Sequence, residues 1–235
     1  MQRNIKFRDI GLIRFHEAWD YQKKLFEEVW QVKKVNKEAK ENKTFESLNY
    51  LLFCEHPHVY TIGKSGQDAN LLINDQELIN YGAELFHIDR GGDITYHGPG
   101  QIVGYPILDI QYLKFGVKQY VHLIEESVIQ TLKEYGIEAG RLDGATGVWL
   151  NSQGKNIRKI CAIGVKASHF ITMHGFAFNI NTDLKYFDYI NPCGFTDKGV
   201  TSLSKELGKP VDIEEVKKSL TEKISSVFNI NLLSE

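Results

Sequence analysis

Cys193 is the residue whose setting could support nucleophilic chemistry, in the short sequence Asn-Pro-Cys-Gly at residues 191–194. Proline restricts the backbone before the thiol, and glycine leaves space beside the sulfur. The other two cysteines, Cys54 and Cys161, have apolar neighbours, which is typical of core positions. A lone cysteine is more often structural than catalytic. The residue type therefore leaves both interpretations of Cys193 open.

A thiol nucleophile needs a base, because a free cysteine with a pKa of about 8.5 is mostly protonated at neutral pH. The candidates are His97, His174 and Lys159. Histidine titrates near neutrality, whereas lysine needs desolvation or a cationic neighbour to act as a base. Lys159 precedes a strand-like apolar stretch, where a solvated lysine at a strand edge is the alternative interpretation. The residue types alone do not decide which group activates the thiol.

A glycine-rich stretch at residues 90–101 supplies a candidate binding loop. Four glycines and one proline in twelve residues argue against an ordinary helix or a central strand. Apolar segments at 85–88 and 102–108 flank it, so we expect a shaped loop between two strands. Glycine allows a ligand to approach the backbone closely, and polar groups would come from Arg90, Asp93, Thr95, Tyr96, His97 and Gln101. A tight turn that faces solvent is the alternative.

Helices are predicted where apolar residues recur at three- and four-residue steps, at 15–32, 117–135 and 212–227. Gly136 is suited to end the second helix, and Asp212 with Glu215 forms a capping-box pattern for the third. A short helix with an acidic first turn is expected from residue 74. The charged run 33–43 is interpreted as a solvated helix end and loop.

Short apolar segments predict strands at 8–13, 50–54, 59–63, 85–88, 102–108, 145–150, 157–166 and 170–180. A turn signal at 151–154 favours antiparallel pairing of its neighbours. The sequence His-Pro-His at 56–58 is interpreted as a structural turn, because no third metal ligand is nearby. We predict one domain over residues 1–235, of the α/β (α+β) class, with helices packed on a single mixed, largely antiparallel sheet.

The composition excludes several classes of function. The 235 residues are 42% hydrophobic and 25% charged with a net charge of −2, so there is no overall basic field for nucleic acid. Three scattered cysteines without a CxxC pair argue against a disulfide framework or a structural zinc site. The N-terminus lacks a signal-peptide core, and no apolar run approaches the length of a membrane span. We expect a cytoplasmic protein without metal, nucleic-acid or membrane partners.

A set of ordered sequence blocks resembles the signature of the octanoyltransferases of lipoate biosynthesis. The blocks cover residues 90–106, 146–149, 159–164, 174–179, 191–194 and 200–203. The resemblance implies the catalytic-domain fold of the biotin and lipoate protein ligases. It also implies transfer of an octanoyl group from octanoyl-acyl carrier protein to a lysine of a lipoyl domain, with no cofactor. The lipoyl domains would be those of 2-oxo acid dehydrogenases and of the glycine cleavage H protein, and we expect a monomer.

The resemblance further implies a role for each matched residue. Cys193 would be the acyl-thioester nucleophile, Lys159 would lower its pKa and act as a general base, and His174 is a candidate supporting residue. Tyr96 and His97 would face the reacting group. The residues expected to bind substrate are Arg90, Gly91, Gly92, Asp93, Ile94, Thr95, Tyr96, His97, Ala162, Ile163, Gly164, Gly175, Phe176 and Ala177.

Two surfaces and two other functions stay open at this point. Apolar walls for an acyl chain could come from Tyr96, Ile163, Phe176 and Phe178, although core packing explains them equally well. A basic rim could come from Arg90, Lys155, Arg158, Lys166 and Lys198, or these could be scattered surface charges. An ATP-dependent lipoate ligase on the same fold is the alternative enzyme, but the sequence has no Walker-type loop. A carrier-binding module without activity is the non-enzymatic alternative.

Overall fold

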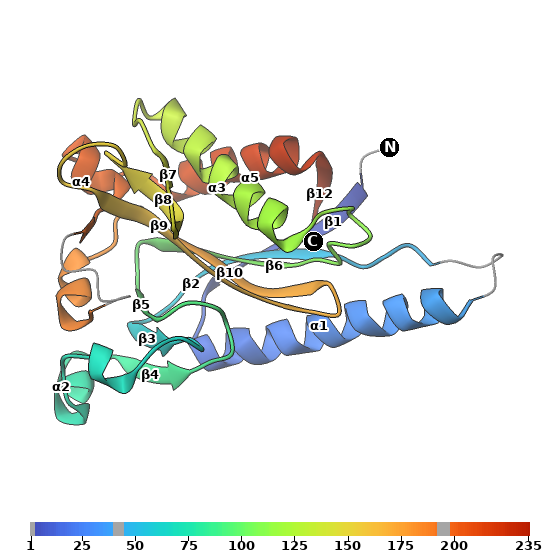
Figure 1. Cartoon of the computed structure of the whole chain (residues 1–235), viewed down its shortest axis with the longest axis horizontal. Helices are drawn as coiled ribbons and strands as arrows, with labels where there is room; N and C mark the ends of the chain where they lie inside the picture. The colour runs from blue at the N-terminus through green and yellow to red at the C-terminus, as the bar shows by residue number, and fades with distance from the viewer. Residues whose placement is uncertain (1–2, 40–44, 192–197) are drawn as a thin grey trace.

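The computed structural model describes residues 3–39, 45–191 and 198–235, which form a large sheet, a small sheet and the helices packed on them (Figure 1). The large sheet has the strand order β12 (Ile230–Ser234), β1 (Arg3–Leu12), β2 (Tyr50–Glu55), β6 (Gln101–Ile107), β10 (Ile171–Asn179), β9 (Arg158–Ser168), β8 (Ala145–Leu150) and β7 (Gly140–Leu142), while β11 (Gly199–Val200) pairs with β9. The small sheet has the order β4 (Glu84–His87), β3 (Val59–Ile62) and β5 (Ile94–His97).

The strands at the centre of the large sheet pair antiparallel, from β2 through β6, β10, β9 and β8 to β7. The exceptions are β1, which pairs parallel with both β12 and β2, and β11, which pairs parallel with β9. Parallel neighbours need a crossover connection, and the helix after β1 provides it for β2. The predicted α+β class with a mixed, largely antiparallel sheet is confirmed.

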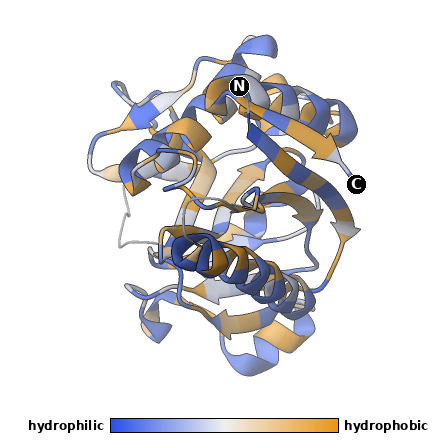
Figure 2. Cartoon of the chain, turned by 90° about the vertical axis from the view of Figure 1, so that its right-hand side faces the viewer, coloured by the Kyte–Doolittle hydropathy of each residue, from blue (hydrophilic) through white to orange (hydrophobic). Residues whose placement is uncertain are grey.

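Helices cover both faces of the large sheet, as Figures 1 and 2 show. Helix α1 (Phe15–Glu38) lies on one face, and α3 (Val117–Glu134) and α5 (Ile213–Phe228) lie on the other. The shorter helical segments are η1 (Asp68–Asn70), α2 (Asp75–Asn80), η2 (Leu184–Tyr189) and α4 (Leu203–Leu207). The three long helices match the predicted periodic regions, because each buries the apolar stripe that its sequence shows.

Strand β2 shows why the sheet is apolar on both faces. Leu51 and Phe53 pack in the cluster beneath α3 and α5, whereas Leu52 and Cys54 pack in the cluster beneath α1. Successive side chains of a strand point to opposite faces, so a strand covered on both sides is continuously apolar. This packing confirms the strand predicted at 50–54.

Two predictions about the elements are wrong. The predicted single sheet is two sheets, and the predicted loop at 90–101 contains strand β5, which pairs antiparallel with β3. Helix α1 continues into the charged run, where Lys33 Nζ lies 2.7 Å from a carboxylate oxygen of Asp109. The helix end predicted in this run is therefore present, and within it the Lys33 side chain is mostly buried, with 16% of its surface exposed.

A search of the described helices finds none that combines the length and the apolar character needed to span a membrane.

Candidate active site

A cavity of about 750 Å³ lies between the large sheet and the small sheet. Its floor comes from β6, β10, β9 and β8, on the face that α1 also covers. Its opposite side comes from β5, the preceding turn and η2. Pockets for small molecules commonly have this size, and a cavity formed by so many separate elements is a candidate ligand site.

The turn of residues 90–93 is held against the rest of the protein by its own polar groups. The Arg90 guanidinium is buried and donates hydrogen bonds to the Thr61 carbonyl oxygen (2.7 Å) and hydroxyl (3.0 Å). The Asp93 carboxylate accepts from the Asn70 amide at 2.8–2.9 Å and from the Ile94 N–H at 2.6 Å. The charged groups of this turn therefore fix its shape, in addition to bordering the cavity.

Gly164 of β9 provides the surface on which this turn rests. The Gly91 N–H donates to the Val165 carbonyl oxygen at 2.9 Å. A Cβ atom at Gly164 would lie 2.9 Å from both the Gly91 carbonyl oxygen and the Arg90 Cδ. A side chain at position 164 would therefore push the turn away from the sheet, which explains the glycine.

His97 is a buried, neutral group on the cavity wall. Its Nδ1 donates to the Gln101 Oε1 at 2.8 Å, and the Gln101 amide donates to the Asn179 Oδ1 at 2.8 Å. The Asn179 amide in turn donates to the Thr201 carbonyl oxygen at 3.0 Å. Burial lowers the pKa of His97 to about 3. The imidazole is therefore uncharged at neutral pH and is a weak base.

His174 is a second buried, neutral imidazole, at another part of the cavity wall. Its backbone adopts a positive φ of 57°, and its N–H donates to the Gln22 Oε1 at 2.9 Å. Its Nε2 lies 3.1 Å from a carboxylate oxygen of Asp89. Burial lowers the pKa of His174 to about 4, even though the Asp89 carboxylate acts in the opposite direction. The neutral ring is held in place by hydrogen bonds at both its backbone and its side chain.

Lys159 is the amine that reaches the cavity from β9. Its Nζ lies 4.5 Å from the centroid of the Trp149 ring on β8, so the amine is held over an aromatic face. Its carbonyl oxygen accepts from the Thr201 N–H at 2.9 Å, and Lys159 itself pairs with Val200 of β11. Strand β11 therefore holds the chain after residue 197 beside this lysine.

Cys193 lies outside the described residues. The chain on either side of residues 192–197 is described, and both Ile190 and Lys198 line the cavity. The Asn191 N–H donates to the Asn70 carbonyl oxygen at 2.8 Å, and the Gly199 N–H donates to the Ile157 carbonyl oxygen at 2.9 Å. The main chain thus enters and leaves this segment at the same cavity.

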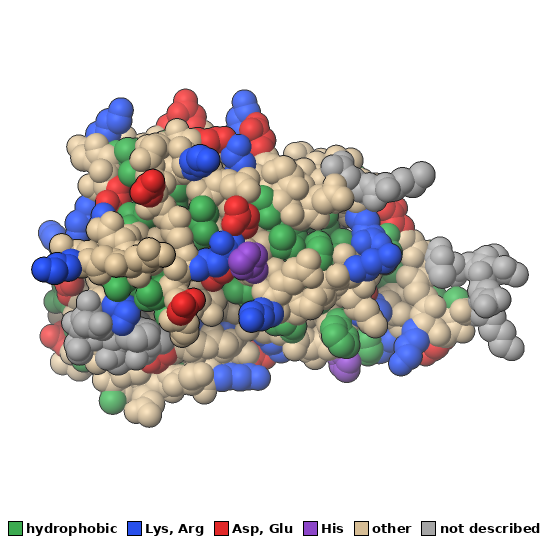
Figure 3. Space-filling view, turned by 45° about the horizontal axis from the view of Figure 1, so that its top comes forward, with side chains coloured by type: hydrophobic (Ala, Val, Ile, Leu, Met, Phe, Trp, Pro, Cys, Tyr) green, Lys and Arg blue, Asp and Glu red, His purple; other side chains and the backbone are tan. Residues whose placement is uncertain are grey.

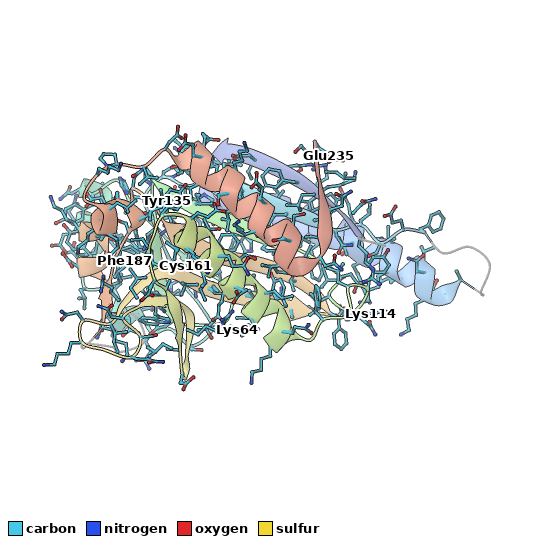
Figure 4. The ribbon with its side chains drawn as sticks, turned by 90° about the horizontal axis from the view of Figure 1, so that it is seen from above. Lys64, Lys114, Tyr135, Cys161, Phe187 and Glu235 are labelled. Carbon is cyan, nitrogen blue, oxygen red and sulfur yellow. The ribbon has the colours of Figure 1, made fainter. Side chains whose placement is uncertain are left out.

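The other cysteines have the environment expected of core residues. Cys54 and Cys161 are free and buried, and burial raises the pKa of both thiols. Figure 4 labels Cys161, which belongs to the core cluster beneath α3 and α5. The same figure labels Phe187 of η2, which lines the cavity. Neither buried thiol is suited to act as a thiolate nucleophile.

The structure brings most of the predicted site residues to the one cavity. Its lining includes Arg90, Gly92, Asp93, Ile94, Thr95, His97, Lys159, Ala162, Ile163, Gly164, His174, Gly175, Phe176 and Ala177. Gly91 holds the turn through its N–H bond to β9. The Phe176 ring also packs edge-on against Phe53 in the core, with centroids 6.1 Å apart.

Tyr96 has a different position from the one expected, on the face of β5 opposite to His97. Its hydroxyl hydrogen-bonds the His58 Nδ1 at 2.7 Å, and its ring stacks on Tyr186 with centroids 4.9 Å apart. Neighbouring residues of a strand point to opposite faces, so Tyr96 and His97 do not both face the cavity. Phe178, expected as a wall residue, packs in the core beneath α3 and α5.

The structure shows the surroundings of the residues that were considered for a basic rim. Arg90 is buried, Arg158 Nε donates to Glu206 at 2.6 Å, and Lys166 lies 2.5 Å from the Asp89 carboxylate. The cations Lys185, Lys198 and Lys205 line the cavity. Figure 3 shows positive and negative side chains interspersed over the face that it presents. Burial or ion pairing thus accounts for three of the five residues considered for a rim, whereas Lys198 lies at the cavity.

Several lining residues lie outside the sequence blocks and were missed by the sequence analysis as site residues. They are apolar or aromatic side chains from α1, the residue after β4, and η2, and they include Phe15, Ile88, Leu184 and Phe187. Core residues have the same apolar character, so the sequence alone could not show that these side chains line a cavity. Within the described ranges, no cluster of three or more histidine, cysteine, aspartate or glutamate side chains could hold a metal ion.

The fold defines the class of the protein. A solved structure described as lipoate-protein ligase A bound with ATP matches with a TM-score of 0.68 over 100% of this chain and 89% of that chain, at 16% identity. A bi-partite lipoate protein ligase from Thermoplasma acidophilum matches with a TM-score of 0.67 over 100% and 87%, at 15% identity. At these identities the likeness shows the fold, and the predicted catalytic-domain fold is confirmed.

Similarity of sequence defines the family to which the chain belongs. The profile of the family described as Lipoyl protein ligase A/B catalytic domain matches residues 15–225, and the chain belongs to this family. An octanoyltransferase of Bacteroides fragilis is 55% identical over 90% of this chain and 92% of its own length. An octanoyltransferase of Flavobacterium johnsoniae is 50% identical over 99% of this chain and 100% of its own length. The resemblance inferred from the sequence blocks is thereby confirmed.

Proposed function

We propose that this chain transfers an octanoyl group from octanoyl-acyl carrier protein to a lysine of a lipoyl domain, through a thioester on Cys193. The octanoyl transfer itself is the activity of its relatives, which are 46–55% identical over at least 90% of the chain. A lipoyl domain as acceptor agrees with the family. The donor, the thioester, and a monomer as the active form are the finer parts of the proposal.

The observation that carries the proposal is that sequence blocks far apart in the chain line one cavity. Residues of the blocks beginning at 90, 146, 159, 174 and 200 all contribute to its walls. The cavity combines apolar walls with a lysine and with neutral polar side chains. This combination suits an acyl chain that ends in a thioester carbonyl.

Two features support Cys193 as the nucleophile. The cavity is bordered by the described residues on both sides of its segment, Ile190 and Lys198. The remaining cysteines, Cys54 and Cys161, are buried in the core with a raised pKa. A thioester intermediate needs a thiolate, and Cys193 is the thiol whose neighbouring residues meet the site.

Lys159 is the better candidate for the base than either histidine. Burial lowers the pKa of His97 to about 3 and that of His174 to about 4, so each imidazole holds a proton weakly. Each ring is also engaged, His97 with Gln101 and His174 with Asp89. Lys159 reaches the cavity beside β11, directly after the segment that carries Cys193. The base left open by the sequence is therefore assigned to Lys159 within this proposal.

In the first reaction step, the Cys193 Sγ–H passes its proton to the neutral Lys159 amine. The thiolate attacks the octanoyl carbonyl carbon, a new C–S bond forms, and the bond to the donor sulfur breaks. The Lys159 ammonium returns the proton to the departing thiolate. One thioester replaces another, so the step is close to energy-neutral and needs no ATP. Backbone N–H groups at the cavity would stabilise the oxyanion.

In the second step, the amine of the acceptor lysine attacks the thioester on Cys193. Lys159 takes a proton from that amine, the C–S bond breaks, and the proton passes to the Cys193 thiolate. An amide replaces a thioester, which makes the overall reaction favourable. A general base in this position contributes typically about 10²–10⁴-fold to the rate.

Reconstitution with purified components tests the proposed function. The chain is mixed with octanoyl-acyl carrier protein and a lipoyl domain in the absence of ATP, and the mass of the lipoyl domain is followed. We expect a gain of one octanoyl group on the acceptor lysine, both for a dehydrogenase lipoyl domain and for an H protein. Octanoylation that requires ATP and free octanoate would select the ligase alternative instead. Carrier binding without any transfer would select the binding module.

A further inference from the structure

We propose that Phe15, the first residue of α1, closes the end of the acyl cavity opposite to Lys159 and limits the length of the transferred chain. This inference rests on the octanoyl transfer proposed above and adds the determinant of its chain-length preference. Phe15 lies outside the sequence blocks of the site. It lines the cavity, and only 2% of its surface is exposed.

The cavity extends across the strands of the large sheet. Lys159 lines it on β9, Ala177 on β10 and Val103 on β6. Phe15 lies farther along, against His56, which directly follows β2. Neighbouring strands lie about 4.8 Å apart, so the three steps from β9 to β2 span roughly 14 Å. Phe15 and Lys159 thus mark opposite ends of one cavity.

This distance suits an octanoyl chain. Eight carbons joined by bonds of about 1.5 Å extend over roughly 9–10 Å. With its carbonyl near Lys159, an extended octanoyl chain would reach β6 and end close to Phe15. A chain with two or more additional carbons would meet the ring.

The Phe15 ring is held in place from several sides. It lies parallel to the His97 ring with centroids 6.3 Å apart, and edge-on to His56 at 5.5 Å. Phe86 packs against it at 5.3 Å, and Ile88 belongs to the same buried cluster. A ring in such packing cannot move aside as an exposed side chain would, because each neighbour is itself buried or half-buried.

The chemistry of the two ends is different. The Lys159 end has an amine and the Asn179 amide, which donates to the carbonyl oxygen of Thr201, the residue whose N–H bonds the Lys159 carbonyl oxygen. The Phe15 end has the apolar side chain of Ile88, and His97 there turns its Nδ1 toward Gln101. This polarity fits a carbonyl at the first end and a terminal methyl group at the second.

The test compares acyl-acyl carrier protein donors of six to fourteen carbons for the unmodified chain and for Phe15→Leu and Phe15→Ala. Each additional buried methylene contributes about fourfold to kcat/KM. We expect the ratio of decanoyl to octanoyl kcat/KM to rise about tenfold in Phe15→Ala, with a smaller rise in Phe15→Leu. Ile88→Phe, which adds bulk at the same end, should shift the preference toward hexanoyl.

Phe86→Leu is the matched control. Phe86 contacts the Phe15 ring but is not part of the cavity lining found among the described residues. This variant should lose a similar amount of aromatic packing and keep the length preference. Thermal melting identifies the variants that fold, and Phe15→Leu and Ile88→Phe test the inference if Phe15→Ala does not.

The outcomes separate this inference from the proposed function. Absence of octanoyl transfer by the unmodified chain would overturn the proposed function and the inference with it. Active, folded Phe15 and Ile88 variants with unchanged length preference would overturn the inference alone. An equal shift in Phe86→Leu would also overturn it, because the effect would then come from general loosening.

Discussion

At the scale of single residues, the proposed mechanism assigns the histidines to positioning the substrate and Lys159 to moving protons. His97 and His174 are buried, neutral and hydrogen-bonded to Gln101 and Asp89. Lys159 is half-buried and lies beside a cavity and an aromatic ring. The histidines are therefore suited to shape the site, whereas the lysine amine is suited to exchange protons.

Lys159→Ala is expected to reduce octanoyl transfer by about 10²–10⁴-fold, because the base for both steps is removed. The initial rate of lipoyl-domain octanoylation measures this. Alkylation of Cys193 by iodoacetamide at neutral pH should also become slower, since the thiolate loses its partner. Lys155→Ala, at an exposed position in a turn, is the matched control and should retain full activity. Equal rates for both variants would exclude Lys159 as the base.

The sequence allowed much of the site to be predicted, but not the orientation of every side chain. His97 and Tyr96 are adjacent in a block, and only the pairing of β5 with β3 determines which of them faces the cavity. Phe15 and Ile88 have the same apolar character as core residues. Their role depends on contacts between elements that are distant in the chain, and no local pattern records such contacts.

At the scale of elements, glycines allow strands and rings to approach closely beneath the cavity. A Cβ at Gly104 of β6 would lie 2.2 Å from the Phe176 ring of β10. Phe176 is itself buried against Phe53. The glycine therefore provides the space in which this ring packs.

Gly104→Ala is expected to destabilise the protein by about 1–3 kcal/mol, the usual effect of overpacking a core. Urea unfolding followed by circular dichroism measures the change. Gly154→Ala is the matched control, because the nearest atom to its Cβ would be 3.8 Å away. Its effect should stay within about 0.5 kcal/mol. A Gly104→Ala variant as stable as the control would show that the Phe176 ring can move without cost.

Helices and strands differed in how well the sequence predicted them. The long helices followed from the apolar periodicity within each segment. The small sheet did not, because β5 has only four residues and pairs with a strand more than thirty positions earlier. The parallel pairing of β1 with β12 joins the two ends of the chain and has no local signal either.

At the scale of the whole molecule, three buried histidines link stability to pH. Burial lowers the pKa of His56 to about 4, of His97 to about 3 and of His174 to about 4. In the unfolded chain each has an ordinary pKa of about 6.5. Between these values the unfolded state binds more protons than the folded state. Stability is therefore complete above pH 6.5 and is lost as the pH falls.

The free energy of unfolding is expected to fall by roughly 3–4 kcal/mol between pH 7 and pH 5.5, about one third of it from each histidine. Urea denaturation at several pH values measures the slope. His56→Gln should reduce this slope by about one third, whatever its effect on stability at pH 7. A free energy of unfolding that is constant over this range would contradict the buried, neutral state of these side chains.

The most direct test of the central claim is the mass of the enzyme after reaction with octanoyl-acyl carrier protein in the absence of an acceptor. We predict the gain of one octanoyl group, located by peptide mapping on Cys193 and lost when a lipoyl domain is added. The Cys193→Ala variant should gain no octanoyl group and transfer none. An unmodified Cys193 in an enzyme that turns over, or full activity of the Cys193→Ala variant, would contradict the thioester mechanism.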